Sequence, residues 1–333
     1  MKLSIIIKAL NEEHNIARAI ESSLEVISEV GSGEVVLADS LSTDKTIEIA
    51  SKYPIKTVQL VNPTDRSCGV GAQLGFQVSR GQYLYILDAD MEFEHGFINE
   101  AISLLEANPR LGGVGGLVKE MNVGSLEFKK RSERKNANLS PGHVNSLDMG
   151  GLYRREALAD VGYFTNRNLN SYEELELGSR LKTAGWELVR IDVPSVKHYG
   201  HTIEAFRLLF KRWRSGYIFG VGELLRSAYG KSHFGFILKN MKQLRLYLAY
   251  ILWWALITVS MIGAINYDWS YMAVALLLLT PFLGMIIKKK SLYSGFYSVV
   301  ASNFNAIGLC VGVLRKPRVP ASKLVDFNVI KDV

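Results

Sequence analysis

Cysteine and proline are scarce in this chain, with two cysteines and eight prolines in 333 residues. Cys68 and Cys310 lie far apart and in very different settings, so they lack the close spacing of a metal site. We expect both thiols to be reduced and structural. The chain also contains no internal repeat and no low-complexity tract, which argues against a repeat architecture.

A glycine-rich dinucleotide-binding loop is missing as well. A nicotinamide-binding dehydrogenase needs G-x-G-x-x-G directly after its first strand. Here the first apolar run ends at Ile7, and residues 8–11 contain no glycine. Gly69 and Gly71 come much later, and Gly75 is one residue out of step with the motif. The sequence therefore argues against a dehydrogenase.

Apolar residues, by contrast, are abundant, at 48% in a chain with 21% charged residues. They concentrate in three runs without any charge, at residues 246–265, 271–287 and 292–314. Because a helix of about 20 residues spans the roughly 30 Å of a bilayer core, we predict that the first two runs form a membrane hairpin. The third run contains serines and asparagines and has basic residues on both flanks. We therefore predict a re-entrant or interfacial segment there.

Basic residues indicate how the chain lies at the membrane. The net charge is +7, and the lysines and arginines crowd into residues 207–245 and 288–290, beside the apolar runs. Such flanks are typically cytosolic, and the N-terminus shows no signal peptide, so we expect an inner (cytoplasmic) membrane protein with a cytosolic N-terminal domain. Residues 206–217 place apolar side chains on one helical face and basic ones on the others, which predicts a helix in the headgroup region. We expect anionic membrane lipids as partners, and no nucleic acid.

Residues 1–205 alternate strand-like and helical segments. The strand-like runs lie at 2–7, 34–39, 56–61, 83–88, 147–153 and 188–193. This order predicts an α/β domain with a mostly parallel sheet. The polar stretch 120–145 is weakly patterned, and we predict a mobile loop crossing the site. The predicted organisation is an α/β domain at 1–205, basic amphipathic helices at 206–245, a membrane region at 246–318 and a cytosolic tail at 319–333.

Two carboxylates end one of these strands. Asp88 and Asp90 follow the apolar run 83–87, so a parallel sheet would deliver both to its carboxyl edge, where α/β proteins bind ligands. Acidic groups this close repel each other unless a cation lies between them. A divalent Mn²⁺ or Mg²⁺ bridging a diphosphate suits such hard oxygen ligands. By itself, the pattern is equally typical of a solvated turn.

The order of motifs around this pair resembles glycosyltransferase family 2, whose catalytic domain has the GT-A fold, a Rossmann-like and mostly parallel sheet. The match covers about residues 2–201. Its motifs are the strand and A-x-N-E-E turn at 4–13, the strand and S-T-D turn at 36–44, the helix at 71–75, the D-x-D at 88–90, the acceptor-side turn at 149–157 and the E-D region at 172–181.

The resemblance implies a nucleotide site at the first strands. In the family, the residue matching Asp39 binds the base, and those matching Ala9 and Glu12 line the nucleoside. Arg66 matches the segment beside the diphosphate. Asp88 matches the D-x-D position that contacts the nucleotide as well as the metal.

The resemblance also implies a divalent-cation cofactor, Mn²⁺ or Mg²⁺. Its ligands would be Asp90, Asp88 and His198. His198 matches a histidine that often completes the metal shell; the alternative is a hydrogen-bonded histidine at a strand end. A metal there neutralises the charge that develops on the departing diphosphate.

Glu173 and Glu174 occupy the E-D region, where the second acid is the base that deprotonates the acceptor hydroxyl. A glutamate at 174 replaces the usual aspartate, and a displacement on the scale of about 1 Å can lower a rate about a hundredfold. The alternative is a surface acid on the helix, paired with a base such as Arg180. Lys8 is a further departure, since it stands where the family often has proline. A carboxylate acting as base on the far side of the sugar predicts inversion by single displacement.

Together these features predict a membrane-bound, inverting glycosyltransferase in polysaccharide or glycoconjugate biosynthesis. We expect a nucleotide-sugar donor, a UDP-sugar above others, and a lipid-linked saccharide acceptor. The apolar stretch 305–309 resembles the same region of bacterial exopolysaccharide glycosyltransferases of the succinoglycan type. One alternative is a transferase that uses polyprenyl phosphate itself as acceptor. The other, from another class, is a non-catalytic membrane protein that binds nucleotides.

Overall fold

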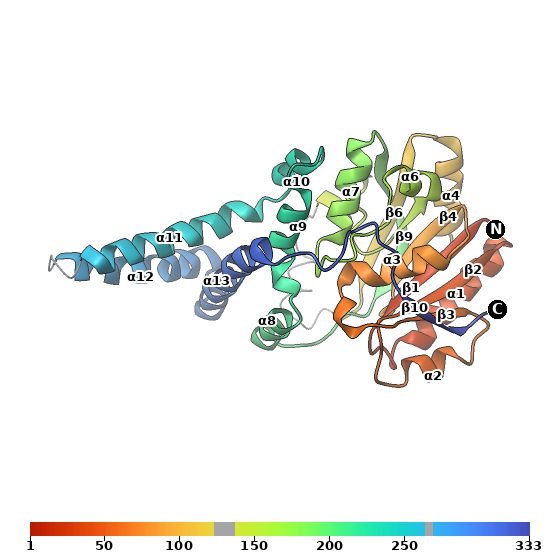
Figure 1. Ribbon diagram of the computed structural model, residues 1–333, viewed down its shortest axis with the longest axis horizontal. Helices are drawn as coiled ribbons and strands as arrows, with labels where there is room; N and C mark the ends of the chain where they lie inside the picture. The colour runs from red at the N-terminus through yellow and green to blue at the C-terminus, as the bar shows by residue number, and fades with distance from the viewer. Residues whose placement is uncertain (123–136, 264–268) are drawn as a thin grey trace.

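The computed structural model describes residues 1–122, 137–263 and 269–333. Its N-terminal part is built on one large mixed sheet, with helices on both faces (Figure 1). The strand order is β10-β3-β2-β1-β4-β8-β6-β9-β5, with β7 beside β9. The strands are β1 (Leu3–Ala9), β2 (Gly33–Asp39), β3 (Lys56–Leu60), β4 (Tyr83–Asp88), β5 (Met91–Phe93), β6 (Leu111–Glu120), β7 (Gly142–His143), β8 (Gly151–Arg154), β9 (Glu187–His198) and β10 (Phe327–Lys331).

Strands β1 to β4 form the parallel half of the sheet, as the sequence predicted. Consecutive residues of β1 are buried against opposite faces, with Ile5 and Ile7 in one core and Ile6 in the other. Because both faces are covered, the strand is apolar at nearly every position instead of alternating with polar residues. Gly75 of α3 (Cys68–Val78) lies so close to Ile6 that a Cβ atom there would meet its side chain.

The remaining helices of this domain flank the sheet. They are α1 (Ile16–Val30), α2 (Thr46–Ala50), α4 (Phe97–Ala107), α6 (Arg155–Asp160) and α7 (Glu173–Thr183), with short 3-10 turns η1 (Pro63–Asp65) and η2 (Ala137–Leu139). Strand β9 is longer than the predicted run 188–193 because it pairs along its length with β6, and its end pairs with β5 as well. Of the loop predicted at 120–145, residues 123–136 lie outside the described residues, while 142–143 pair with β9.

Beyond the sheet, the chain becomes helical. The elements are α8 (Ala205–Arg214), η3 (Tyr217–Phe219), α9 (Gly220–Ala228), α10 (Phe234–Asn240), α11 (Gln243–Gly263), α12 (Trp269–Lys289) and α13 (Leu292–Leu314). In Figure 1, α11 and α12 lie side by side and project away from the sheet domain. Among the described residues, three helices are long and apolar enough to cross a membrane: Gln243–Gly263, Tyr271–Lys289 and Leu292–Leu314.

The third of these helices differs in shape from the segment expected. It is one unbroken helix of 23 residues, and it packs along α9 close to the sheet domain. A Cβ atom on Gly222 of α9 would lie 2.2 Å from the carbonyl oxygen of Leu309, and one on Gly312 would lie 2.1 Å from that of Phe219. Glycines on both helices therefore let the backbones approach each other closely.

Helix α8 is amphipathic, as the sequence predicted, but its aromatic face is used within the protein. The ring of Phe206 packs against Tyr293, Phe296 and Tyr297 of α13. The basic residues of α8 at 207, 211 and 214 are exposed. The exposed side of this helix is therefore its basic side, while α13 covers part of the apolar side.

The chain end also departs from the expected layout. Residues 319–333 were assigned to a separate cytosolic tail, but β10 pairs antiparallel with β3 and extends the sheet of the N-terminal domain. Val325 is buried in the same core as Val58, and its backbone exchanges hydrogen bonds with the side chain of Gln77. The tail thus runs from the last apolar helix back onto the sheet (Figure 1).

Candidate active site

The site forms where β1 and β4 end side by side. In the parallel register, Lys8 is the partner of Asp88. The Lys8 ammonium lies 2.9 Å from an Asp88 carboxylate oxygen and 3.9 Å from one of Glu173. Burial lowers the pKa of Lys8, but Asp88, Glu173 and Glu174 together raise that pKa further, so the net pKa lies well above its usual value. Lys8 is therefore a permanent cation among acids.

Lys8 is the functional residue that sequence reasoning missed. From the sequence, Lys8 was notable only because it stands where the family often has proline. The available signal was a lysine inside an otherwise apolar strand, one position before Ala9, with Asp88 ending the strand that pairs with it. A buried lysine needs a partner, and a carboxylate on the neighbouring strand supplies one.

The two glutamates predicted as catalytic begin helix α7. Glu173 is buried, and Glu174 is partly buried and accepts a hydrogen bond of 3.2 Å from the amide of Met149. Burial raises the pKa of Glu174 well above its usual value, and the charges of Glu173 and Asp148 add to this rise. Burial also raises the pKa of Glu173, against the opposing effect of Lys8. Lys8 and both glutamates line one cavity.

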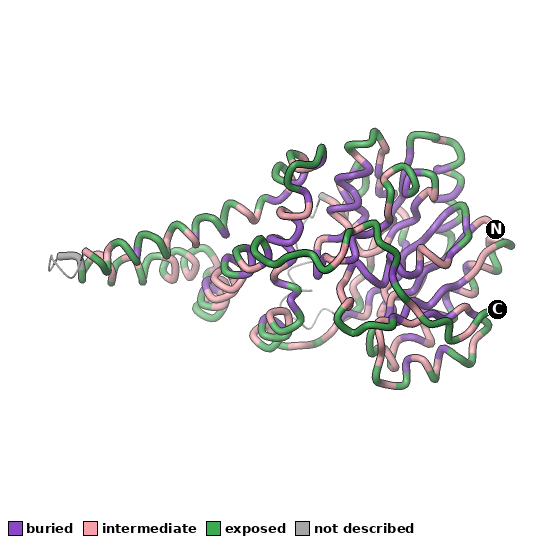
Figure 2. The backbone as a smooth tube through the Cα atoms, viewed as in Figure 1, coloured by how far each residue is buried: buried purple, intermediate pink, exposed green. Residues whose placement is uncertain are grey.

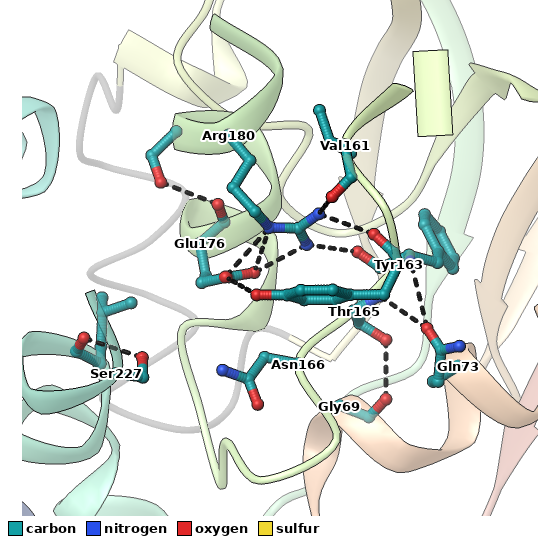
Figure 3. A network of polar contacts seen from close by, with 12 residues as sticks. Gly69, Gln73, Val161, Tyr163, Thr165, Asn166, Glu176, Arg180 and Ser227 are labelled. Atoms are coloured by element: carbon teal, nitrogen blue, oxygen red, sulfur yellow. Dashed lines mark hydrogen bonds and ion pairs between the residues drawn. The ribbon is translucent and has the colours of Figure 1, made fainter. Parts of the chain in front are cut away.

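The alternative pairing of Glu174 with Arg180 is wrong. Arg180 forms its ion pair with Glu176, at 2.8 Å, and donates to the carbonyls of Val161, Tyr163 and Phe164 (Figure 3). This network instead ties α7 to the chain segment before it.

A second set of contacts holds that same segment on α3. The Gln73 side chain accepts from the amides of Phe164 and Thr165, and the Thr165 hydroxyl donates to the carbonyl of Gly69 (Figure 3). Gly69 lies so close to Asn166 that a Cβ atom there would meet its backbone. The start of α7, and with it Glu173, is thus positioned by buried hydrogen bonds.

The second carboxylate of the D-x-D faces His198. The Nε2 of His198 lies 3.3 Å from an Asp90 carboxylate oxygen, and its Nδ1 lies 2.6 Å from one of Glu120. Burial lowers the pKa of His198, but the hydrogen bonds to both acids raise it to about 9. Glu120 was placed by the sequence in a loop; it ends β6, directly beside His198 in β9.

This arrangement fits part of a divalent-cation site. Among residues 1–122, 137–263 and 269–333, no group of three or more His, Cys, Asp or Glu side chains is close enough to hold a metal unaided. Asp90 would supply one oxygen ligand and His198 one nitrogen ligand. The other ring nitrogen of His198 contacts Glu120, and a carboxylate in this position commonly orients a metal-bound histidine. Mg²⁺ is commonly held by one or two carboxylates plus substrate phosphates, so a diphosphate would supply the remaining ligands. The carboxylate of Asp88, in contrast, already forms an ion pair with the Lys8 ammonium.

The predicted nucleotide residues gather at the ends of β1 and β2. Ala9 is the register partner of Asp39. The Asp39 carboxylate is fully buried and accepts from the Ser42 amide at 2.9 Å and from the Gln59 amide group at 2.9 Å. Glu12 lies in the turn after β1, where its backbone amide donates to Thr46. Burial raises the pKa of Glu12.

Arg66 lies at this end of the site, and its side chain contacts the turn that follows β2. Its Nε donates to the carbonyl of Ser40 at 2.8 Å, and its Nη2 donates to that of Leu41 at 2.5 Å. Leu41 has a φ of 65°. The guanidinium therefore holds the turn that follows Asp39 in a left-handed conformation.

Comparison with solved structures identifies the fold. A mannosyltransferase from Pyrobaculum calidifontis, PcManGT, in complex with GDP-Man and Mn²⁺ is 18% identical with a TM-score of 0.62, over 94% of this chain and 87% of that one. S. aureus TarS 1-349 in complex with UDP-GlcNAc is 16% identical with a TM-score of 0.52, over 99% and 96%. The fold is the GT-A fold, a Rossmann-like sheet followed here by a helical region.

The family follows from the sequence comparison. Residues 4–162 match the model of glycosyl transferase family 2 and belong to that family. A curated relative, the N-acetylglucosaminyl-diphospho-decaprenol L-rhamnosyltransferase of Mycobacterium tuberculosis (strain CDC 1551 / Oshkosh), is 26% identical over 206 residues, which are 50% of this chain and 66% of that protein. The chain spans about a quarter of the length of several other curated glycosyltransferases that it matches.

Proposed function

We propose that the protein is an inverting glycosyltransferase that moves a sugar from a nucleotide-sugar donor to a lipid-linked saccharide. One observation carries this proposal above the others. Glu174 has a raised pKa and lines one cavity with Glu173 and Lys8, and Lys8 and Asp88 belong to the segment 4–162 that matches the family 2 model, where Asp88 ends its strand. A base, its charge-balancing groups and a diphosphate-binding edge thus lie together.

Glu174 is the proposed base. As its carboxylate takes the proton of the acceptor hydroxyl, the acceptor oxygen bonds to the anomeric carbon and the bond to the donor diphosphate breaks. The nucleoside diphosphate leaves with the bonding electron pair, and attack from the far side inverts the anomeric centre. A carboxylate is most effective as a base when its pKa approaches the working pH, and the raised pKa of Glu174 meets this condition. Glu173 holds Lys8 beside it.

A divalent cation, Mn²⁺ or Mg²⁺, is the proposed cofactor, and Asp90 and His198 would hold it. When bound, such an ion neutralises charge on the departing diphosphate. His198 must be neutral to donate to a metal, and its pKa near 9 without one means that binding would displace a proton. Asp88, held by Lys8, would face the donor. The Mn²⁺ in the PcManGT complex supports this assignment.

The donor is proposed to be a UDP-sugar. The buried Asp39 carboxylate at the end of β2 can accept from a nucleobase imide, and Ala9 and Glu12 flank it. TarS in complex with UDP-GlcNAc supports uridine, whereas PcManGT in complex with GDP-Man supports guanosine as the competing base.

The acceptor is proposed to be lipid-linked and the site cytosolic, at the inner membrane, in polysaccharide or glycoconjugate biosynthesis. In the described part of the chain, three helices long enough to span a bilayer follow the catalytic domain. A relative named for a diphospho-decaprenol acceptor supports this acceptor class. Polyprenyl phosphate itself is the second candidate acceptor.

A single experiment tests the chemistry. The full chain in detergent would be supplied with UDP- and GDP-sugars, Mn²⁺ and a polyprenyl diphosphate saccharide, and transfer would be followed by mass spectrometry. Glu174→Gln should bind nucleotide but lose about 10²–10⁴-fold in turnover, the contribution expected of a general base. Glu100→Gln, an exposed acid on α4, is the matched control. EDTA should stop transfer, and Mn²⁺ should restore it.

Unchanged turnover in Glu174→Gln, or a product that keeps the donor's anomeric configuration, would reject the mechanism. Loss in Glu173→Gln instead would move the base by one residue. Nucleotide binding without transfer to any acceptor would favour a non-catalytic nucleotide-binding protein.

A further inference from the structure

A small polar hollow lies where α13 ends and the tail begins. Its walls include Arg226 and Glu223 of α9 and three basic residues that follow the end of α13. These three residues are Arg315, Lys316 and Arg318. The lining of this hollow therefore contains four basic side chains and one carboxylate.

That carboxylate is already engaged. Glu223 accepts from Asn170 at 2.9 and 3.1 Å, and it lies 3.4 Å from Arg315. Arg318 donates to a backbone carbonyl, which carries no net charge. In the part of the chain that the structure describes, the Nε of Arg226 is buried without a hydrogen-bond partner. A buried hydrogen-bond donor without a partner needs an explanation, and an anion bound in the hollow would accept from this donor.

The electrostatics of the hollow agree with this reading. Burial lowers the pKa of Arg226 and of Arg318, and the nearby charge of Arg315 lowers that of Arg318 further. Arg226 is partly buried and Arg318 is exposed, and an anion that enters between such cations offsets their mutual repulsion.

An apolar groove adjoins this hollow. It is lined without any charged residue by Leu225 of α9, Leu248 and Ile251 of α11, and Val313 and Leu314 of α13, among others. Leu225 precedes Arg226 in the chain, and Leu314 precedes Arg315, so consecutive residues line the groove and the polar hollow at two places. Leu248 is 51% exposed and Leu314 is 80% exposed.

The two hollows lie at the right depth for a lipid. The groove is made by the first turns of α11 and the last turns of α13, the ends that face the catalytic domain (Figure 1). Exposed residues continue along α11 away from the domain (Figure 2). A hydrocarbon chain in the groove would place a headgroup against the arginines. Basic pockets beside spanning helices on the cytosolic side bind acidic headgroups.

We propose that these two hollows form a binding site for one acidic phospholipid, with its phosphate against Arg226, Arg315 and Arg318 and an acyl chain in the groove. A bulk phospholipid is the occupant because the groove opens between two helices that face the bilayer. The bound lipid would join α9, the end of α13 and the start of the tail. Asn170, held by Glu223, lies three residues before Glu173, so the site also borders the segment that leads to the catalytic helix.

The test is native mass spectrometry of the full chain released from nanodiscs containing equal phosphatidylglycerol and phosphatidylcholine. We expect one phosphatidylglycerol retained per chain. Arg226→Gln should weaken retention about fivefold, the effect of one surface charge on an anionic lipid. Arg110→Gln, at an exposed arginine just before β6 and far from the hollow in the chain, should change nothing. Leu248→Trp should fill the groove and expel the lipid, whereas Leu252→Trp, one turn further along α11 and 61% exposed, should not.

Several results would overturn the proposal. They are the absence of retained phospholipid, equal loss in the two control variants, displacement by inorganic phosphate alone, and replacement one for one by a polyprenyl diphosphate saccharide. The last would assign the site to the acceptor. Circular dichroism and melting temperature in detergent would show that each variant is folded, and the groove variant tests the site even if Arg226→Gln does not fold.

Discussion

Strand β1 and helix α12 are both strongly apolar, but β1 is buried within the protein and α12 is not. Most of β1 is buried between α1 and α3, and its one cation, Lys8, is enclosed by carboxylates. Of the apolar window in α12, none is buried within the protein. The N-terminal domain therefore supplies its own apolar environment, whereas α12 leaves its apolar side chains exposed, as a helix in contact with lipid would. Substitutions in the catalytic domain should have the same effect in detergent and in bilayers. The effect of substitutions in the helical region should depend on the bilayer.

The largest effect is expected from Lys8→Met. It leaves Asp88 and Glu173 without their cation, and breaking a buried ion pair costs about 3 kcal/mol. Misplacing the acids should also lower turnover about a hundredfold. Thermal unfolding and turnover, measured in detergent and in nanodiscs, check both effects.

Two controls accompany this variant. Lys8→Arg keeps the charge and should retain most of the stability. Lys2→Met removes an exposed pair with Glu106 and should change stability by ~0.5 kcal/mol or less. If Lys8→Met were as harmless as Lys2→Met, Lys8 would not organise the site.

The next largest effect is expected at the tail. Val325→Asp places a carboxylate in the core beneath β10, at 2% exposure, and should cost about 2 kcal/mol or more. The melting temperature should fall by about 5 °C. Leu324→Asp, at the neighbouring residue with 66% exposure, should be nearly neutral. An equal melting temperature for both variants would show that the tail is not part of the domain in solution.

A third prediction concerns pH. The pKa of Glu174 is raised, so its carboxylate is lost as the pH falls through a value well above 4.5. Below that folded pKa, turnover should fall about tenfold per pH unit, because a protonated carboxyl cannot accept a proton. The linked stability has the opposite sign. A raised carboxyl pKa stabilises the fold at low pH, and this contribution disappears as the pH rises through the folded pKa.

Turnover and melting temperature, each measured against pH, check this prediction. An acid limb of the turnover profile near the ordinary glutamate pKa would contradict it. The same profile in detergent and in nanodiscs would place the titrating group in the catalytic domain.

The smallest effect is expected on α8. Lys211→Ala removes one exposed charge beside the predicted headgroup zone and should lower transfer on anionic vesicles about fivefold. On neutral vesicles, or with a short water-soluble acceptor, the loss should vanish. A loss of the same size in all three settings would mean that Lys211 acts through the protein and not through lipid.

Much of the catalytic domain could be predicted because its signals are local. The strands 2–7, 34–39, 56–61 and 83–88 each stand out as a short apolar run, and all four were found in the parallel half of the sheet. The carboxylates at 88 and 90 could be placed at the sheet edge for the same reason. Strand β10 could not be predicted, since it gains its partner β3 only after the chain has passed through the helical region.

Sequence alone determined the family, the alternation of strands and helices, the charge-free spans and the acids at strand ends, because these depend on short-range patterns of polarity. Tertiary structure decided which charges meet. Lys8 reaches Asp88 through strand pairing and Glu173 at the start of α7, and Glu120 reaches His198 on the neighbouring strand. It also decided that the tail belongs to the sheet. These contacts join residues far apart in the chain, and their energy depends on burial and distance, which the sequence does not carry.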